Sequence, residues 1–190
     1  MRKSLLAVGL VLGLPAMAAA QQIQLGVGAT LTQVSELTDG YDASSGDVGY
    51  TLGGNLRFGK VLSLSPGLYW QQLRFDFKDE QAGTSEVLGL TGFQVPVLVG
   101  LGLDLKVVAA RIYAGPSVTF LTSVTDNQFG LEKAAFKSTS FGGQIGVSVD
   151  VLMLAIDVSQ EIPFTDVFES ATPYGAGKLG VTRVGLAFRF

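Results

Sequence analysis

The side chains that could carry out chemistry in this chain are few. Its 190 residues include no histidine and no cysteine, which excludes disulfides, thiol chemistry, histidine metal sites and nucleophile–histidine triads. Asp76, Asp79 and Glu80 form one acidic group that could serve a hydrolase or bind a cation. Their spacing is not that of a calcium-binding loop, and a solvated loop end explains them as well. We therefore expect no catalytic residue, no cofactor and no bound metal.

A second set of charged residues lies inside segments of alternating polarity, always on the polar side. The set comprises Arg57, Arg111, Asp150, Asp157, Glu161, Arg183 and Arg189. An unpaired charge in a narrow interior is costly, so we expect a paired network that fixes strand register. Counting along the segments places Glu161 near Arg183, and Asp157 near Arg57 and Arg111. The alternative interpretation is a gated path for small solutes.

The segments that carry these charges have the period of two that is typical of β-strands. In "IQLGVGATL", for example, every second residue from Ile23 to Leu31 is apolar. Eight such segments occur, at 23–31, 48–60, 62–72, 87–103, 110–120, 141–151, 154–164 and 181–190. Short connections alternate with long polar ones, which lie at 35–47, 78–86, 125–137 and 165–177. This order predicts an all-β, up-and-down antiparallel barrel with short turns at one end and long, mostly acidic loops at the other.

The composition decides which face of the sheet meets water. Charged residues make up 15% of the chain, against about 25% in ordinary soluble domains. The polar face consists mainly of Gly, Ser, Thr and Gln, which suits a packed interior rather than a solvated exterior. The apolar face would then meet lipid, where only a closed barrel leaves no unpaired edge. We therefore predict an eight-stranded transmembrane β-barrel, whose interior is only wide enough for side chains.

Aromatic residues support this interpretation because they fall at two heights. Six of them lie at a similar distance from the short-turn end, at Tyr50, Trp70, Phe93, Phe120, Phe141 and Phe164. Phe58, Phe188 and Phe190 lie at the short-turn end itself. Membrane barrels carry aromatic girdles at both interfaces, so we interpret the six as one girdle.

The first 20 residues have the organisation of a secretory signal peptide. Arg2 and Lys3 precede an apolar stretch at 5–14, and Ala18 and Ala20 supply small residues at the expected cleavage point. A membrane anchor is the alternative, but the apolar stretch is short for a spanning helix. We predict a signal peptide at 1–20 and a barrel domain at 21–190. Acidic residues outnumber basic ones, so nucleic-acid binding is not expected.

Four stretches, "LSLSPGLYWQQ", "FQVPVLVGLGL", "RIYAGPSVTFL" and the terminal "GLAFRF", resemble the outer-membrane β-barrel proteins of Gram-negative envelopes, in particular small porin-like barrels of the PorT type. The resemblance implies a place in the cell outer membrane, in contact with its lipid and lipopolysaccharide. It also implies that the terminal strand, with Phe188 and Phe190, is read by the outer-membrane assembly machinery. Gln94 departs from the family pattern, which often has Glu there, so an interior charge contact is expected to be missing.

These observations favour a non-enzymatic protein with a structural or loop-mediated binding role, such as adhesion. Aromatic residues in the long loops could contact an extracellular ligand; they are Tyr41, Phe129, Phe136, Phe168 and Tyr174. A narrow porin-like channel is the alternative. A lipid-modifying barrel enzyme is less favoured because such sites usually include histidine.

Deletion of Phe190 tests the interpretation of the terminal strand. If the assembly machinery reads this residue, the fraction of chain assembled in the outer membrane should fall more than the loss of one lipid-facing side chain explains. Membrane fractionation with heat-modifiable gel migration measures that fraction, and Phe164→Ala is the matched control. Unchanged assembly would count against the signal role.

Overall fold

The computed structural model describes residues 22–35, 41–44, 47–79, 83–105, 107–129, 131–168 and 177–190. They form nine strands and one short 3-10 turn, which are β1 (Gln22–Ser35), β2 (Tyr41–Ser44), β3 (Val48–Arg57), β4 (Leu62–Asp79), β5 (Thr84–Asp104), β6 (Val108–Val124), η1 (Lys133–Ala135), β7 (Thr139–Val151), β8 (Leu154–Pro163) and β9 (Lys178–Arg189). Within these residues no helix is long and apolar enough to cross a membrane. The predicted signal peptide at 1–20 lies outside the described residues.

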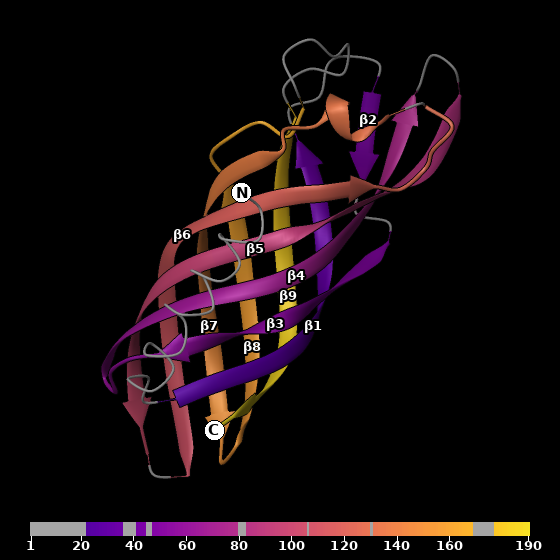
Figure 1. The fold of residues 1–190 in the computed structure, drawn as a ribbon. Helices are drawn as coiled ribbons and strands as arrows, with labels where there is room; N and C mark the ends of the chain where they lie inside the picture. The colour runs from indigo at the N-terminus through magenta and orange to yellow at the C-terminus, as the bar shows by residue number, and fades with distance from the viewer. Residues whose placement is uncertain are drawn as a thin grey trace, which may run out of the picture.

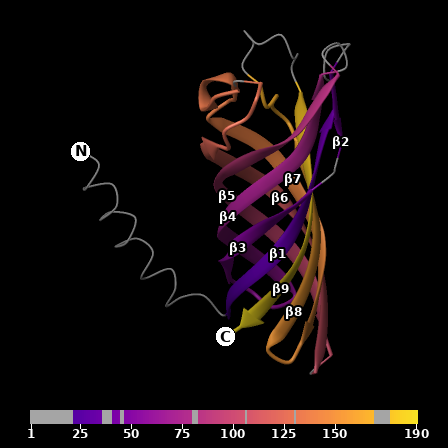
Figure 2. The same ribbon diagram turned by 90° about the vertical axis from the view of Figure 1, so that its right-hand side faces the viewer.

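All strands except β2 form a closed antiparallel ring, so the prediction of an eight-stranded barrel is confirmed. β1 and β9 close it, with Gln24 opposite Arg189 and Ser35 opposite Lys178. The closing seam continues to the last residue, because Ile23 and Phe190 exchange backbone hydrogen bonds of 3.1 and 2.8 Å. The strands wind steeply around the long axis, and the C-terminus lies at the short-turn end, opposite β2 (Figures 1 and 2).

Several strands extend farther toward the long-loop end than the alternation predicted. β4 continues to Asp79, β5 begins at Thr84 and β6 reaches Val124, so most of the segment 78–86, which was predicted as a loop, belongs to a hairpin. The short strand β2 pairs with residues 76–79 of β4, just beyond the point where β3 stops pairing with it at Gln72. β2 and β3 therefore follow one another along the same edge of β4.

The polarity of β4 inverts along its length. From Leu62 to Trp70 the exposed positions are apolar, and the alternate inward positions are polar or small. Above Gln72 the pattern reverses. The buried positions become Leu73, Phe75 and Phe77, while Arg74, Asp76 and Lys78 occupy the outer positions. The reversal is what a strand needs when it leaves hydrocarbon and meets water, because its apolar side chains can then be buried only inside.

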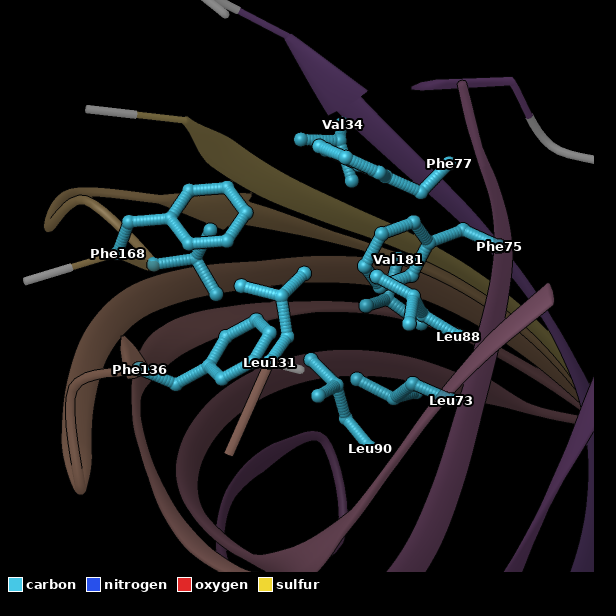
Figure 3. Packing of buried hydrophobic residues seen from close by; sticks show 11 residues of the cluster. Val34, Leu73, Phe75, Phe77, Leu88, Leu90, Leu131, Phe136, Phe168 and Val181 are labelled. Atoms are coloured by element: carbon cyan, nitrogen blue, oxygen red, sulfur yellow. The ribbon is translucent and has the colours of Figure 1, made fainter. Parts of the chain in front are cut away.

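These inward apolar side chains form a core above the polar lumen (Figure 3). The core joins strand ends to segments far apart in sequence, and its buried members are Val34, Leu73, Phe75, Phe77, Leu88, Leu90, Leu131, Phe136, Val167, Phe168 and Val181. The ring centroids of Phe136 and Phe168 are 5.1 Å apart, and those of Phe77 and Phe129 are 5.3 Å apart. We call this set the extracellular core.

The extracellular core corrects one expectation about the loops. Phe136 and Phe168, predicted to contact a ligand, are each only 1% exposed and pack inside the core. They are apolar side chains outside the membrane, so water drives them inward as in a soluble domain. Tyr174 lies outside the described residues, and only the backbone of Tyr41 is described.

Large side chains in the lumen lie over glycines on the neighbouring strand. Tyr113 of β6 is directly opposite Gly146 of β7, and Tyr69 of β4 is opposite Gly53 of β3. A Cβ atom at Gly53 would lie 2.7 Å from the ring of Tyr69, and one at Gly146 would overlap the Tyr113 ring. The interior is therefore filled by large side chains that occupy the space left by glycines on the neighbouring strand.

The substitution Gly146→Ala should destabilise the barrel by about 1–3 kcal/mol, because the Tyr113 ring must shift within a packed interior. Gly180→Ala is the matched control, since its Cβ would meet no atom closer than 3.6 Å. Urea unfolding of the refolded barrel in lipid vesicles gives both values. Equal stability of the two variants would contradict the interlocked packing.

Candidate functional site

The predicted polar residues of the lumen form two clusters, one near each end. At the short-turn end, which is periplasmic in barrels of this type, three arginines surround Asp150. Its Oδ2 atom lies 2.8 Å from Nη1 of Arg189, 3.2 Å from Nη1 of Arg57 and 3.6 Å from Nη1 of Arg111. Asp150 is 1% exposed. The network that the sequence predicted therefore centres on this carboxylate at the periplasmic end.

Strand register brings these four residues together from four strands. Arg57 ends β3 opposite Gln22, and Arg189 ends β9 opposite Gln24. Arg57 also donates hydrogen bonds to the side-chain oxygens of Gln22 and Gln24, at 2.8 and 2.9 Å. The glutamines fix the guanidinium plane, so the position of Arg57 does not depend on Asp150 alone.

Asp157 lies at the height that the sequence predicted, but among the described residues it forms no ion pair with Arg57 or Arg111. The register places Arg111, Ser148 and Asp157 in one row across β6, β7 and β8. The guanidinium of Arg111 nevertheless extends toward Asp150, and Asp157 accepts a hydrogen bond from Tyr113 instead. The length of the arginine side chain, rather than its Cα position, decides this partnership.

The second cluster lies farther up the lumen, around Glu161. One carboxylate oxygen of Glu161 accepts from Gln94 at 2.7 Å, and the other accepts from Ser117 at 3.1 Å. Arg183 donates to the side-chain oxygens of Gln94 and Gln71, at 2.5 and 3.3 Å. Its guanidinium also lies 5.1 Å from the ring centroid of Tyr69, a distance that permits a cation–π contact.

Glu161 and Arg183 lie on neighbouring strands, as the sequence predicted, but they are not directly opposite each other. Arg183 lies opposite Ser159 and Glu161 lies opposite Val181, and no ion pair joins the two within the described residues. Gln94 connects them. Its carbonyl oxygen accepts from the guanidinium while its amide nitrogen donates to the carboxylate. A glutamate at this position could not donate to Glu161 when ionised, so the departure at Gln94 replaces the expected contact rather than removing it.

Between the clusters lies a cavity of about 70 Å³. Tyr69, Tyr113 and Asp157 line its walls, together with Arg57 and Arg111. Tyr69 accepts a hydrogen bond of 3.0 Å from Asn55. A smaller cavity of about 30 Å³ lies above Glu161, toward the extracellular core. The Gln94–Glu161 cluster separates the two cavities.

The six predicted girdle residues all have outward side chains that are 37–66% exposed: Tyr50, Trp70, Phe93, Phe120, Phe141 and Phe164. Phe93 lies directly opposite Trp70 on one side and Phe120 on the other. Phe164 donates a backbone hydrogen bond of 2.9 Å to Phe141. At the other end Phe188 and Phe190 are 52% and 68% exposed. The structure brings these rings to the outer surface, and their interfacial and assembly roles stay predictions.

The structure describes only part of the acidic group near the β4–β5 turn. Asp76 is partly exposed on β4, while Glu80 and the side chain of Asp79 lie outside what the structure describes. Among described residues, no group of three or more carboxylates is placed to hold a metal ion.

A model of the outer membrane protein beta-barrel domain matches residues 4–190 of this sequence. The chain belongs to this family. Membership places it in the outer membrane and agrees with the apolar exterior and polar lumen described above. The family resemblance inferred from the sequence is therefore confirmed.

Two solved structures of Ail, the attachment invasion locus protein of Yersinia pestis, are similar in fold. One of them is a complex with the heparin analogue sucrose octasulfate. Each has 17% sequence identity and a TM-score of 0.48, and each match covers 89% of this chain and 98% of Ail. No curated protein sequence matches the chain.

Asp150→Asn should destabilise the barrel strongly, because the buried Arg57 and Arg111 and the partly buried Arg189 would lose their shared carboxylate. Breaking a buried ion pair costs about 3–5 kcal/mol. Asp166→Asn is the matched control. Asp166 pairs with Lys137 at 3.6 Å on the surface, where both side chains are partly exposed, and such pairs contribute less than about 1 kcal/mol. Urea unfolding of both variants in vesicles gives the comparison, and a small effect at Asp150 would show that the cluster carries little energy.

Proposed function

We propose that this protein is a non-enzymatic outer-membrane scaffold that presents a fixed extracellular surface for binding, with adhesion as the expected role. The observation that carries the proposal is the extracellular core. Its buried side chains Phe136 and Phe168 anchor the described parts of the connections that follow β6 and β8. Recognition residues on a rigid scaffold lose little conformational entropy on binding.

The segment between β6 and β7 illustrates how this surface is held. Leu131 and Phe136 are buried in the extracellular core. Asn127 exchanges hydrogen bonds of 2.9 Å with the backbone of Leu131 in both directions. Lys137 donates a backbone hydrogen bond of 2.9 Å to Val167, which ties this segment to the one that follows β8. The exposed residues between these anchors are consequently held in one arrangement.

Charge indicates the kind of partner. Acidic residues predominate in the connections beyond the girdle, and Asp126 and Glu132 are exposed near the anchors. A basic or neutral partner suits this surface better than a polyanion such as the sucrose octasulfate present in the Ail structure. Lipid and lipopolysaccharide are the proposed partners of the outer wall, and the assembly machinery is the proposed partner of the terminal strand.

A narrow channel is the second candidate, because the lumen is polar and contains cavities. Those cavities are small, and the bridge from Arg183 through Gln94 to Glu161 crosses the lumen between them. Above this bridge the extracellular core fills the barrel. An enzyme is less favoured since the chain has neither histidine nor cysteine.

The binding role is tested with a triple variant, Asp126→Ala, Glu132→Ala and Lys133→Ala. All three side chains are exposed, so the extracellular core should remain intact. Non-adherent bacteria that display the wild-type chain should attach to epithelial monolayers or immobilised matrix proteins, and the triple variant should lose most of that attachment. Phe75→Ala is a second variant, because it should loosen the surface by removing a fully buried anchor of the extracellular core. Attachment equal to that of cells without the barrel would overturn the proposal.

The channel alternative is tested by planar-bilayer recordings of the refolded protein. We expect no large, steady conductance steps from the wild type, since polar side chains and the extracellular core obstruct the lumen. Gln94→Ala removes the bridge and serves as the comparison. Steady wild-type channels would favour transport over the scaffold role.

A further inference from the structure

The periplasmic cluster is not electrically balanced. Arg57, Arg111 and Arg189 share one oxygen atom of Asp150, so the cluster has two more positive than negative charges. The other oxygen of Asp150 is buried and has no hydrogen-bond partner. Two further carboxylates act electrostatically on these arginines, Asp104 on Arg111 and Asp157 on Arg57. Asp104 is exposed at the end of β5. Asp157 lines the same cavity as Arg57, and with Asp157 counted the excess is one positive charge. Buried guanidinium groups in such excess require a further anion or an energetic penalty.

Several buried donors of this cluster also lack partners. Nε of Arg57 and both Nε and Nη1 of Arg111 are inaccessible to solvent and form no hydrogen bond. Arg57 is 4% exposed and Arg111 is 8% exposed. The Ser148 hydroxyl, in the same row as Arg111, is likewise buried without a partner. A buried charged donor without an acceptor is rare in native structures, where ordered water or an ion commonly supplies the partner.

The same residues line the cavity of about 70 Å³ that lies between the two clusters. We propose that this cavity is a binding site for a small inorganic anion, chloride or phosphate, held by Arg57, Arg111 and Ser148. Guanidinium groups bind such anions through charge-assisted hydrogen bonds. The cavity is large enough for a halide or a phosphate ion with water, and too small for an organic polyanion.

Entry of the anion from the periplasmic side is part of the same proposal. Arg189 is the most exposed member of the cluster, with 21% of its side chain accessible, and it donates to the backbone of Leu152 in a short turn. The extracellular side is obstructed by the Gln94–Glu161 cluster and the extracellular core. The anion would therefore exchange with the periplasm. This inference does not depend on the proposed binding role of the extracellular surface.

A variant that supplies its own carboxylate tests the site. Gln24 lines the cavity and already accepts a hydrogen bond from Arg57 through its side-chain oxygen, so Gln24→Glu adds a negative charge with almost no change of shape. Phosphate titrations of the refolded barrel in detergent, at ionic strength held constant with sodium gluconate, should show saturable stabilisation of the wild type. The variant should remain folded and bind phosphate at least about tenfold more weakly, which is the equivalent of one charge-assisted hydrogen bond.

Gln71→Glu is the matched control. Gln71 accepts from Arg183 in the upper cluster and is absent from the lining of this cavity, so its replacement should leave phosphate affinity within about twofold of the wild-type value. Unchanged phosphate affinity in Gln24→Glu would overturn the proposal, and so would identical wild-type stability in phosphate and in gluconate. Crystals of the wild type grown in bromide give an independent measurement. An anomalous peak beside Arg57 and Arg111 would support the site, whereas ordered water without such a peak would overturn it.

Discussion

The structure depends on the need to pair every backbone polar group within hydrocarbon. No water is available there to compensate an open sheet edge, so the first and last strands must meet, and they do so up to the exchange of hydrogen bonds between Ile23 and Phe190. Closure with eight strands fixes a narrow interior. Apolar side chains must then point outward to lipid, and polar side chains must pack inside. The composition of each strand follows from this one constraint.

The narrow interior determines how the charged side chains of the lumen are paired and hydrogen-bonded. Seven charged residues share the lumen with tyrosines that fit only because glycines lie opposite them, as Tyr113 does over Gly146. Side chains with both donor and acceptor groups carry much of the network. Gln94 is the clearest example, because it satisfies Arg183 and Glu161 at once. Satisfaction is incomplete in both clusters, since Nε of Arg183 also lacks a partner, but more buried polar atoms lack one around Asp150.

Beyond the aromatic girdle the strands are surrounded by water, so their apolar side chains are buried inside, as in a soluble protein. β4 records the change within a few residues, since its buried side chains switch from Gln71 to Leu73 and Phe75. The barrel wall thus continues into a small water-facing domain with its own apolar core. A membrane anchor and an extracellular platform are in this way built from the same strands, which is the arrangement that a binding scaffold needs.

The sequence by itself determined the eight strands, their up-and-down order and their lipid-facing sides, because a period of two and the lack of surface charge are local properties. It also held a signal for the inverted segment, since "LRFDFK" alternates in the opposite phase to "LSLSPGLYW". Tertiary structure alone decided which charged side chains in the lumen contact one another. Asp150 rather than Asp157 receives Arg57 and Arg111 because side-chain reach and register across several strands select the contact. Phe136 and Phe168 became core residues for a similar reason: the strand ends that bury them are distant in sequence and adjacent only in the closed barrel.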